Sequence, residues 1–265
     1  MIIDAGTGIR RLGQQLVQTA NGGSNHLTLL ISHHHWDHIQ GFPHFAPAND
    51  ERFTVHLYSL RRPDAGLREL LSGQQELPFS SIPLDSLRSR LEFSELEDND
   101  LLEVGPFKVR NYRLNHPGIT CGYRVEADGG VVAYISDVAP SRDMLLAEGL
   151  PDRRESYWLR ELYENQLKLA NQADLVIYDT FFTPEWYYQR KHWGHSTLED
   201  GVEVCRYASA RHLFMFHHNP ERTDQELACL VLRHQRELEE EEFRLHVARE
   251  GDVYLVEDGE VRLCE

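Results

Sequence analysis

Short apolar runs separated by polar loops recur along the chain and predict buried β-strands. Residues 27–31 form one such run between polar neighbours, and residues 52–59 alternate around Phe53, Val55 and Leu57. The same pattern predicts further strands over 107–114, 120–126, 131–136, 173–178 and 212–216. A sheet-forming chain with many short strands is therefore expected.

Helical periodicity alternates with these strands. Ile9, Leu12 and Leu16 share one helical face, and a longer helix is predicted over 155–171. Two further helices are expected to begin at capping boxes, one formed by Ser196 and Glu199 and the other by Thr223 and Glu226. Strands and helices interleaved in this way predict an α/β fold.

Acidic residues and histidines follow several of the predicted strands. They are His33, His116, Asp137, Asp179 and His217. Open α/β sheets place their ligand sites at the carboxyl ends of strands, where the loops converge. These scattered side chains are therefore expected to meet at one site, which favours a single domain over residues 1–265.

The stretch 32–41, Ser-His-His-His-Trp-Asp-His-Ile-Gln-Gly, concentrates more candidate metal ligands than any other ten residues. Alternate residues of an extended segment point the same way, so His33 and His35 can share one ion while Asp37 and His38 reach another. A solvated histidine-rich loop is the alternative. A lone Asp, a closing Gly and a preceding buried strand argue against it.

Charge and cysteine content limit the classes of function. Asp and Glu number 43 against 27 Lys and Arg, a formal net charge of −16, which does not favour a nucleic-acid partner. The four cysteines lie far apart without a Cys-x-x-Cys pair, so neither a zinc knuckle nor a disulfide framework is predicted. No apolar run approaches the ~18 residues of a membrane span, and no signal-peptide pattern is present, so a cytoplasmic protein without a membrane partner is expected.

Residues 33–41 resemble the metallo-β-lactamase superfamily, whose signature is His-x-His-x-Asp-His followed by Gly three residues on. The resemblance implies an αββα sandwich, with two mixed sheets face to face, helices outside and a dinuclear metal site. It implies that metal one takes His33, His35 and His116, that metal two takes Asp37, His38 and His217, and that Asp137 bridges them. Zn is the leading metal, with Mn or Fe as alternatives.

The stretch Gly194-His195-Ser196-Thr197 resembles the His-Ser-Thr element of tRNase Z-like phosphodiesterases. In that group the histidine interacts with the scissile phosphate and pairs with an acid. The matching acid here is Asp179, an Asp where that group often has Glu. The resemblance thus implies a catalytic set of Asp37, Asp179 and His195.

The expected function is a metal-dependent hydrolase, first of all a phosphodiesterase in which two ions hold a bridging hydroxide against a small nucleotide-like or organic phosphodiester. A thioester or lactone hydrolase is the alternative on the same site, and a metal-binding regulatory protein without turnover is the alternative from another class.

Residues 63–98, with short helices expected over 67–71 and 84–91, are interpreted as a cap beside the site. Relatives of this kind usually carry strands before the equivalent of Asp4, so one or more N-terminal strands are expected to be missing before Met1. Oligomeric state is left open.

Overall fold

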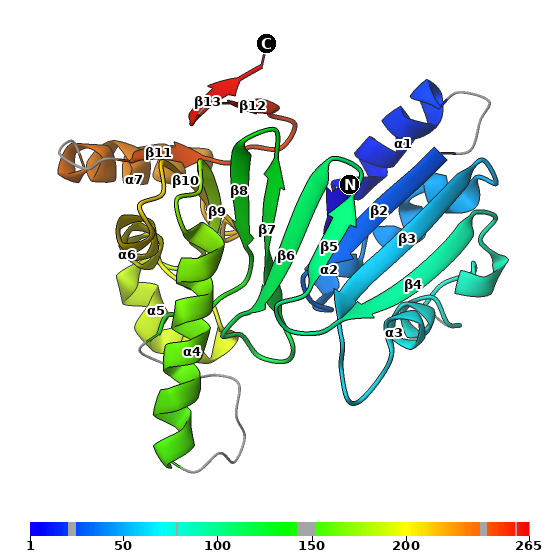
Figure 1. Ribbon diagram of the computed structural model, residues 1–265, viewed down its shortest axis with the longest axis horizontal. Helices are drawn as coiled ribbons and strands as arrows, with labels where there is room; N and C mark the ends of the chain where they lie inside the picture. Colours follow the sequence, from blue (N-terminus) through cyan, green and yellow to red (C-terminus); the bar gives the residue numbers. More distant parts are fainter. Residues whose placement is uncertain (21–24, 78, 142–151, 239–242, 258, 265) are drawn as a thin grey trace. The chain divides into compact units, whose positions relative to one another are not determined.

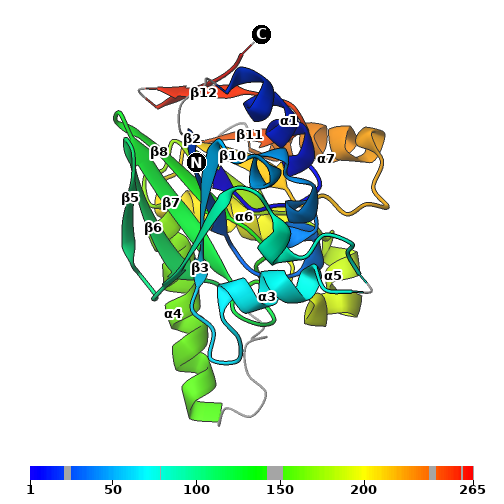
Figure 2. The same cartoon turned by 90° about the vertical axis from the view of Figure 1, so that its right-hand side faces the viewer.

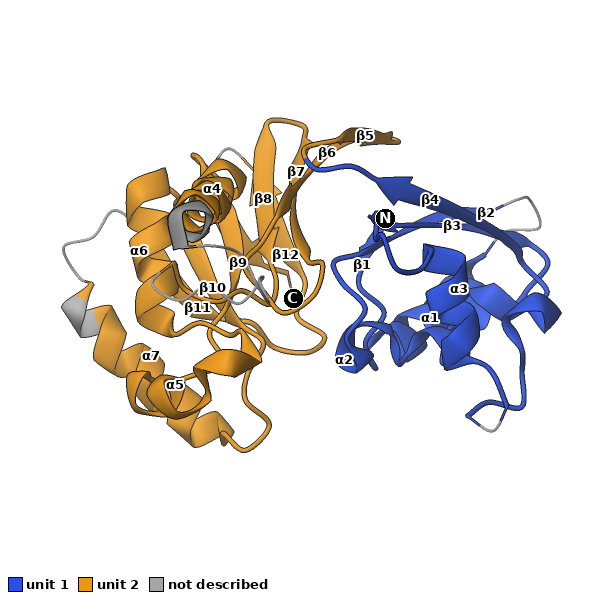
Figure 3. Ribbon diagram, turned by 90° about the horizontal axis from the view of Figure 1, so that it is seen from below, with its two compact units in different colours: residues 1–98 blue, residues 99–265 orange. Residues whose placement is uncertain are grey.

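The computed structural model describes residues 1–20, 25–77, 79–141, 152–238, 243–257 and 259–264. The chain forms two compact units, residues 1–98 (unit 1) and residues 99–265 (unit 2), coloured separately in Figure 3. Each unit has its own sheet and its own buried apolar core. A single functional domain over the whole chain stays a prediction.

Unit 1 is built on a four-stranded parallel sheet in the order β1-β2-β3-β4, of which Figure 1 labels β2, β3 and β4. Its strands are β1 (Ile2–Ile3), β2 (Asn25–Ile31), β3 (Phe53–Leu60) and β4 (Arg90–Leu96), and every neighbouring pair is parallel. The helices of the unit are α1 (Ile9–Thr19), α2 (Trp36–Ile39), η1 (Phe42–His44), η2 (Ala46–Asn49), α3 (Leu67–Gln74) and η3 (Leu84–Ser86).

The core of unit 1 follows from the two-residue period of its strands. Leu29 and Ile31 of β2 alternate with other residues, as do Val55 and Leu57 of β3, and all four are fully buried. Apolar residues of α1 and α3, including Ile9, Leu67 and Leu71, complete the same cluster. Both helices therefore cover one face of this sheet (Figure 3).

Segment 63–98 contributes a strand to the sheet. The helix expected over 67–71 is confirmed as α3, but the helix expected over 84–91 is wrong beyond Ser86, where the 3₁₀ helix η3 ends. Residues Leu91 and Phe93 alternate with polar residues and pair in register with Val55 and Leu57 of β3. The helical spacing of Leu84, Leu87 and Leu91 concealed this period-two pattern. A role for the segment as a cap stays a prediction.

Unit 2 is built on a seven-stranded mixed sheet in the order β11-β10-β9-β8-β7-β6-β5. In chain order the strands are β5 (Leu101–Val104), β6 (Phe107–Arg113), β7 (Cys121–Ala127), β8 (Gly130–Ile135), β9 (Leu175–Asp179), β10 (His212–Phe216) and β11 (Arg244–Val247). Strands β5 to β8 pair antiparallel and β8 to β11 pair parallel. The strands predicted over 120–126 and 131–136 are confirmed as β7 and β8, and the hairpin turn between them contains Asp128 and Gly129, both with the positive φ that a tight hairpin turn requires.

Parallel neighbours need crossover connections, and helices supply them. Helix α4 (Asp152–Ala170) joins β8 to β9, while α5 (Pro184–Arg190), η4 (Lys191–Trp193) and α6 (Leu198–Ala208) join β9 to β10. Helix α7 (Asp224–Glu237) joins β10 to β11. Buried apolar residues of α4, α6 and α7 form one cluster with the sheet. A two-stranded hairpin, β12 (Tyr254–Glu257) and β13 (Glu260–Leu263), lies against the start of β8 (Figure 2).

One of the two expected capping boxes is shifted by a residue. Thr223 and Glu226 form the box that opens α7, with the Thr223 backbone N–H donating to Glu226 Oε2 over 2.7 Å. The box at α6 is formed by Thr197 and Asp200, and not by Ser196 and Glu199. Ser196 instead donates its hydroxyl to the Val138 carbonyl over 2.6 Å, which leaves Thr197 as the N-cap.

In the described part of the chain, no helix is long and apolar enough to span a bilayer.

Candidate metal centre

The histidine-rich stretch begins where β2 ends in the core of unit 1. Its rings lie close together: the centroid of His33 is 4.1 Å from that of His38 and 4.6 Å from that of His35. Asp37 lies on the same turn, with its Oδ2 atom 3.4 Å from His38 Nε2. The structure therefore gathers the four ligand candidates of unit 1, with His33 and His38 buried and His35 and Asp37 exposed.

Asp4 directly follows the neighbouring strand β1 and fixes this loop through hydrogen bonds. Its Oδ2 atom accepts hydrogen bonds from His38 Nδ1 and from the Ser32 hydroxyl, each over 2.8 Å, and its Oδ1 atom accepts from the Ser32 backbone N–H over 2.7 Å. With Nδ1 of His38 donating, the ring's other nitrogen, Nε2, carries the lone pair that a metal ion needs. Sequence reasoning missed Asp4. An acid at the end of a strand before a Gly-rich turn was the available signal.

Backbone contacts fix the loop to the turn after β1. The Ala5 N–H donates to the His38 carbonyl and the Gly41 N–H donates to the Ala5 carbonyl, both over 2.7 Å. A Cβ atom on Gly41 would lie 2.0 Å from the Gly6 carbonyl oxygen. The glycine that closes the motif is therefore required by close backbone approach.

Three further ligand candidates meet in unit 2, each after the end of a strand. Asp137 follows β8, and its two carboxylate oxygens face different imidazoles: Oδ2 is 3.8 Å from His116 Nε2, and Oδ1 is 3.5 Å from His217 Nε2. The carboxylate and His116 are buried. One carboxylate between two imidazole nitrogens is the arrangement expected of a bridging ligand. Imidazole and carboxylate donors suit Zn, Mn and Fe, so the residues present fit such ions.

Gly194 controls the orientation of His116. Nδ1 of His116 donates to the Gly194 carbonyl over 2.8 Å, which leaves Nε2 as the ligand atom. Gly194 has φ +88°, and a Cβ there would lie 2.6 Å from that Nδ1 and 2.3 Å from Pro117 Cδ. A side chain at position 194 would therefore displace the ring from its hydrogen bond.

His195 and Asp179 form a buried pair beside Asp137. His195 Nδ1 lies 2.9 Å from Asp179 Oδ2 and 3.8 Å from Asp137 Oδ2. The backbone N–H groups of Phe181 and Val138 donate to the Asp179 carboxylate over 3.0 and 3.2 Å, and the Phe181 ring stacks on His195 with centroids 4.7 Å apart. Asp137, Asp179, His195 and His217 each offer a ligand atom, and these atoms lie within 4.8 Å of one another. Phe181 is a second residue that sequence reasoning did not single out.

Comparison with known proteins identifies the family. Residues 1–151 match the family model described as "Beta-lactamase superfamily domain", which is more than half of the chain. The chain belongs to the metallo-β-lactamase superfamily. The superfamily resemblance expected from residues 33–41 is thereby confirmed.

Curated relatives place this superfamily member more narrowly. Ribonuclease Z of Streptococcus gordonii is 24% identical, over 82% of this chain and 78% of that protein. Ribonuclease Z of Archaeoglobus fulgidus is 25% identical, over 82% and 77%. The chain is a superfamily hydrolase that is similar to the tRNase Z-like branch, as expected.

Solved structures agree on the fold. The metallo-β-lactamase fold protein YhfI from Bacillus subtilis superimposes with a TM-score of 0.62 at 16% identity, covering 94% of this chain and 85% of that one. The short form of human tRNase Z gives a TM-score of 0.59 at 18% identity, with coverage of 94% and 85%. The metallo-β-lactamase α/β fold predicted from the sequence is confirmed.

Proposed function

We propose that this metallo-β-lactamase superfamily member is a dinuclear-metal phosphodiesterase acting on a small nucleotide-like or organic phosphodiester. The observation that carries the proposal is the buried Asp179–His195 pair, whose imidazole lies beside Asp137. A positioned imidazole serves to bind a phosphoryl oxygen or to donate a proton to a departing alkoxide. It also matches the His-Ser-Thr element of the tRNase Z-like phosphodiesterases, which the chain resembles.

The proposed metal ligands come from both units. Metal one takes His33, His35 and His116, metal two takes Asp37, His38 and His217, and Asp137 bridges. Support comes from the clustering of candidates within each unit, from family membership, and from the two imidazoles that face opposite oxygens of Asp137. Zn is the proposed metal, with Mn or Fe as alternatives that the same donors accept.

Bound divalent ions in such a centre activate water, polarise the substrate and stabilise negative charge on the leaving oxygen. The chain's own groups set the geometry. Asp4 and the Gly194 carbonyl orient His38 and His116, so that each offers its Nε2 atom. Asp179 engages Nδ1 of His195, which leaves Nε2 to hold a proton toward the leaving oxygen. The proposed catalytic set is Asp37, Asp179 and His195.

A small substrate is favoured over a nucleic acid by charge. The chain carries a formal net charge of −16, which repels the polyanionic backbone of RNA. The relatives named ribonuclease Z make an RNA substrate the second candidate. A thioester or lactone hydrolase is the other alternative. A protein that binds metal without turnover is disfavoured, because the sequence has every metal ligand that the superfamily resemblance implies.

The proposal is tested by comparing substrates on the Zn- or Mn-loaded protein. Bis(p-nitrophenyl) phosphate should be hydrolysed well above a thioester and a lactone of similar size. The matched control is Asp137→Ala, which should abolish turnover of any substrate that uses the centre. A thioester or lactone rate at least about tenfold above the diester rate would make the alternative the better assignment; tenfold corresponds to about 1.4 kcal/mol in barrier height. Cleavage of a precursor RNA in preference to every small diester would support the second candidate.

A further inference from the structure

Unit 2 contains a cavity that the proposed metal centre does not use. It has a volume of about 610 Å³ and lies between helix α4 and the antiparallel strands β5 to β7. We call it the α4 pocket. Its lining consists of Leu101, Lys108, Arg110, Tyr112, Arg124, Glu126, Leu167, Lys168 and Asn171. Its β6 residues, Lys108, Arg110 and Tyr112, alternate along the strand, and none of the proposed metal ligands lines the pocket, so the two sites are separate.

Two arginines oppose each other in the floor of this pocket. Arg110 of β6 pairs directly with Arg124 of β7 in the antiparallel register. Directly opposite residues have Cβ atoms about 5 Å apart, and like charges at that position destabilise a sheet. An anion bound between the two guanidinium groups would remove this repulsion. A bound anion would therefore relieve a local electrostatic cost of this pairing.

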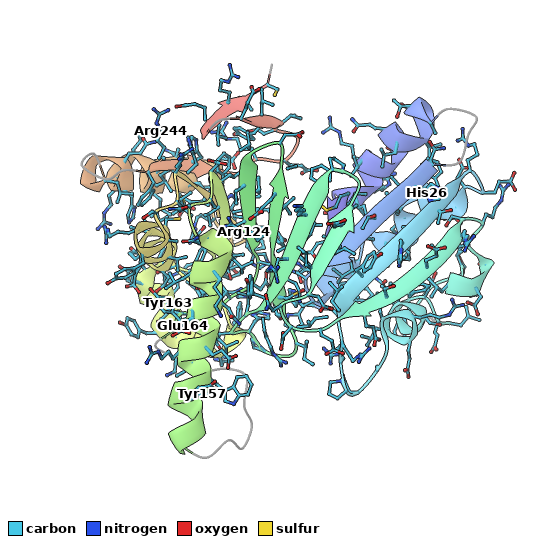
Figure 4. All side chains as sticks on the ribbon, in the orientation of Figure 1. His26, Arg124, Tyr157, Tyr163, Glu164 and Arg244 are labelled. Atoms are coloured by element: carbon cyan, nitrogen blue, oxygen red, sulfur yellow. The ribbon has the colours of Figure 1, made fainter. Side chains whose placement is uncertain are left out.

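Arg124 is already held in position. Its Nη1 group donates to the carbonyls of Leu169 and Asn171 at the end of α4 over 3.0 and 2.8 Å, and its Nε donates to Glu126 over 2.7 Å. Figure 4 labels Arg124 where strand β7 meets α4. Its guanidinium is thus preorganised, and only 15% of its side chain is exposed.

Arg110 and Lys168 have neutral hydrogen-bond partners. Arg110 donates to the carbonyl and side-chain oxygens of Asn99, and the Lys168 ammonium contacts Asn165 Oδ1 over 3.1 Å. Among the residues that the structure describes, no carboxylate lies within ion-pair distance of Arg110, Lys108 or Lys168. The lining therefore carries four cations and one carboxylate, in a chain whose net charge is −16.

Two acids limit the positive surface at one end. Glu103 and Glu126 lie on either side of Lys108 in the register of β5, β6 and β7. At the other end the half-buried Tyr112 ring lies 5.6 Å from the Lys168 ammonium, and Leu101 and Leu167 add apolar surface. The cations thus converge on one bounded hollow with an aromatic wall. This shape suits a compact anion better than a polymer that follows a basic track.

We propose that the α4 pocket binds a small organic phosphate with at least two negative charges. Its phosphate groups would lie between Arg110, Arg124 and Lys168, and its organic part against Tyr112. Arginine binds phosphate through paired N–H donors, and an aromatic ring offers a planar organic group a face for stacking. The proposal is independent of the metal centre and of the reaction carried out there.

Calorimetric titration of the metal-loaded protein with ADP, with inorganic pyrophosphate and with adenosine tests the proposal. ADP should bind more tightly than pyrophosphate, since its adenosine adds contacts, while adenosine alone should not bind measurably. Arg110→Gln and Lys168→Gln should each weaken ADP binding at least about tenfold, the usual scale for a lost charged hydrogen bond. The matched control is Arg160→Gln, which removes an exposed arginine of the same helix and should leave the affinity unchanged.

Thermal unfolding provides a second measurement. A merely structural role of Arg110 would not make the rise in Tm caused by ADP depend on this residue. ADP should raise the Tm of the unmutated protein and of Arg160→Gln, but not that of Arg110→Gln. Without ligand, Arg110→Gln should not lower Tm, because it removes a like-charge pair. Absence of binding with a Kd below about 1 mM, or ADP affinity unaffected by both pocket variants, would overturn the proposal. Arg110-dependent binding of a single-stranded oligonucleotide without binding of ADP would also overturn it and assign the surface to RNA.

Discussion

His38 donates from Nδ1 to the Oδ2 atom of Asp4 over 2.8 Å, and this contact joins the turn after β1 to the short helix α2, two parts of unit 1 that are 34 residues apart in sequence. Asp4 has a positive φ of 60°, and its other contacts, to Ser32, are equally short. Non-glycine residues at positive φ are uncommon and persist where surrounding contacts determine them. The carboxylate is therefore held in position to orient a proposed metal ligand.

Replacing Asp4 with alanine should weaken metal binding without removing a ligand. Loss of an outer carboxylate that orients a metal-bound histidine typically costs about 10–100-fold in metal affinity or activity. Competition with a chelating dye measures the affinity. Asp85→Ala is the control, since Asp85 is exposed in the same unit and contacts only surface groups. Equal metal affinity in both variants would show that Asp4 does not orient His38 for metal.

The proposed bridging role of Asp137 predicts the metal content of the protein. Purified protein loaded with Zn or Mn should contain about two ions per chain, because seven ligand candidates match the superfamily pattern. Asp137→Ala should lose at least one ion and nearly all turnover, since the carboxylate faces both His116 and His217. Elemental analysis measures the ratio. At most one tightly bound ion in the reconstituted, unmutated protein would contradict the dinuclear assignment.

His246 predicts acid sensitivity of the metal-free fold. Burial, with smaller contributions from His212 and Arg244, lowers the pKa of His246 to about 4, and burial also lowers the pKa of His212. The two rings share a hydrogen bond, His212 Nδ1 to His246 Nε2, of 2.9 Å. Unfolded histidine titrates near 6.5, so between about pH 6.5 and 4 the unfolded chain binds more protons than the folded one. The unfolding free energy should therefore fall as pH is lowered through this window.

His246→Gln should reduce that fall, because the glutamine amide can still donate or accept a hydrogen bond with His212 but does not titrate. Urea unfolding of the chelator-treated proteins at pH 7 and pH 5 gives the difference. His26→Gln is the control, since His26 is an exposed histidine of unit 1 (labelled in Figure 4). If His246→Gln loses as much stability between the two pH values as the unmutated protein, another group causes the acid sensitivity.

The strands and the ligand candidates could be predicted because their signals are local. Alternation around Phe53 and Val55 marks β3, and the spacing of His33, His35, Asp37 and His38 is visible within one loop. The position of Asp4 at a strand end was a local signal, but its role could not be assigned from sequence neighbours, because its partners, Ser32 and His38, become adjacent only when β1 pairs with β2. The role of Asp4 depends on the pairing of β1 with β2, which no single stretch of sequence reveals.

Competing local signals explain the other errors. Leu84, Leu87 and Leu91 have helical spacing, yet pairing with β3 makes residues from Arg90 onward a strand. At α6, Ser196 and Glu199 have the spacing of a capping box. However, the Val138 carbonyl accepts a hydrogen bond from the Ser196 hydroxyl, and Thr197 is the N-cap. In both cases a contact distant in sequence decided between two patterns that were equally consistent with the local residues.

His195→Ala should slow hydrolysis without removing metal. Asp179 engages Nδ1 of His195, and the ring stacks on Phe181, so Nε2 is positioned to donate a proton to the leaving oxygen. General acid catalysis of this kind contributes about 10²–10⁴ in rate. The loss should be of that size for an alkyl phosphodiester and much smaller for a p-nitrophenyl diester, whose leaving group needs little protonation. Single-turnover rates on both substrates, with metal content measured on the same samples, test this expectation.

The control for this prediction is His192→Ala, because His192 is an exposed histidine three residues earlier, on η4. It should retain both rates, which would separate the effect of position 195 from general loss of a histidine near the site. Asp179→Asn should reproduce the leaving-group dependence of His195→Ala, because the amide cannot stabilise a protonated imidazole as the carboxylate does. Loss of metal in His195→Ala, or equal slowing of both substrates, would place His195 among the ligands or the structural residues instead. The position of its ring beside Asp137, 3.8 Å from Oδ2, makes that alternative measurable, since a ligand role would lower the metal-to-protein ratio directly.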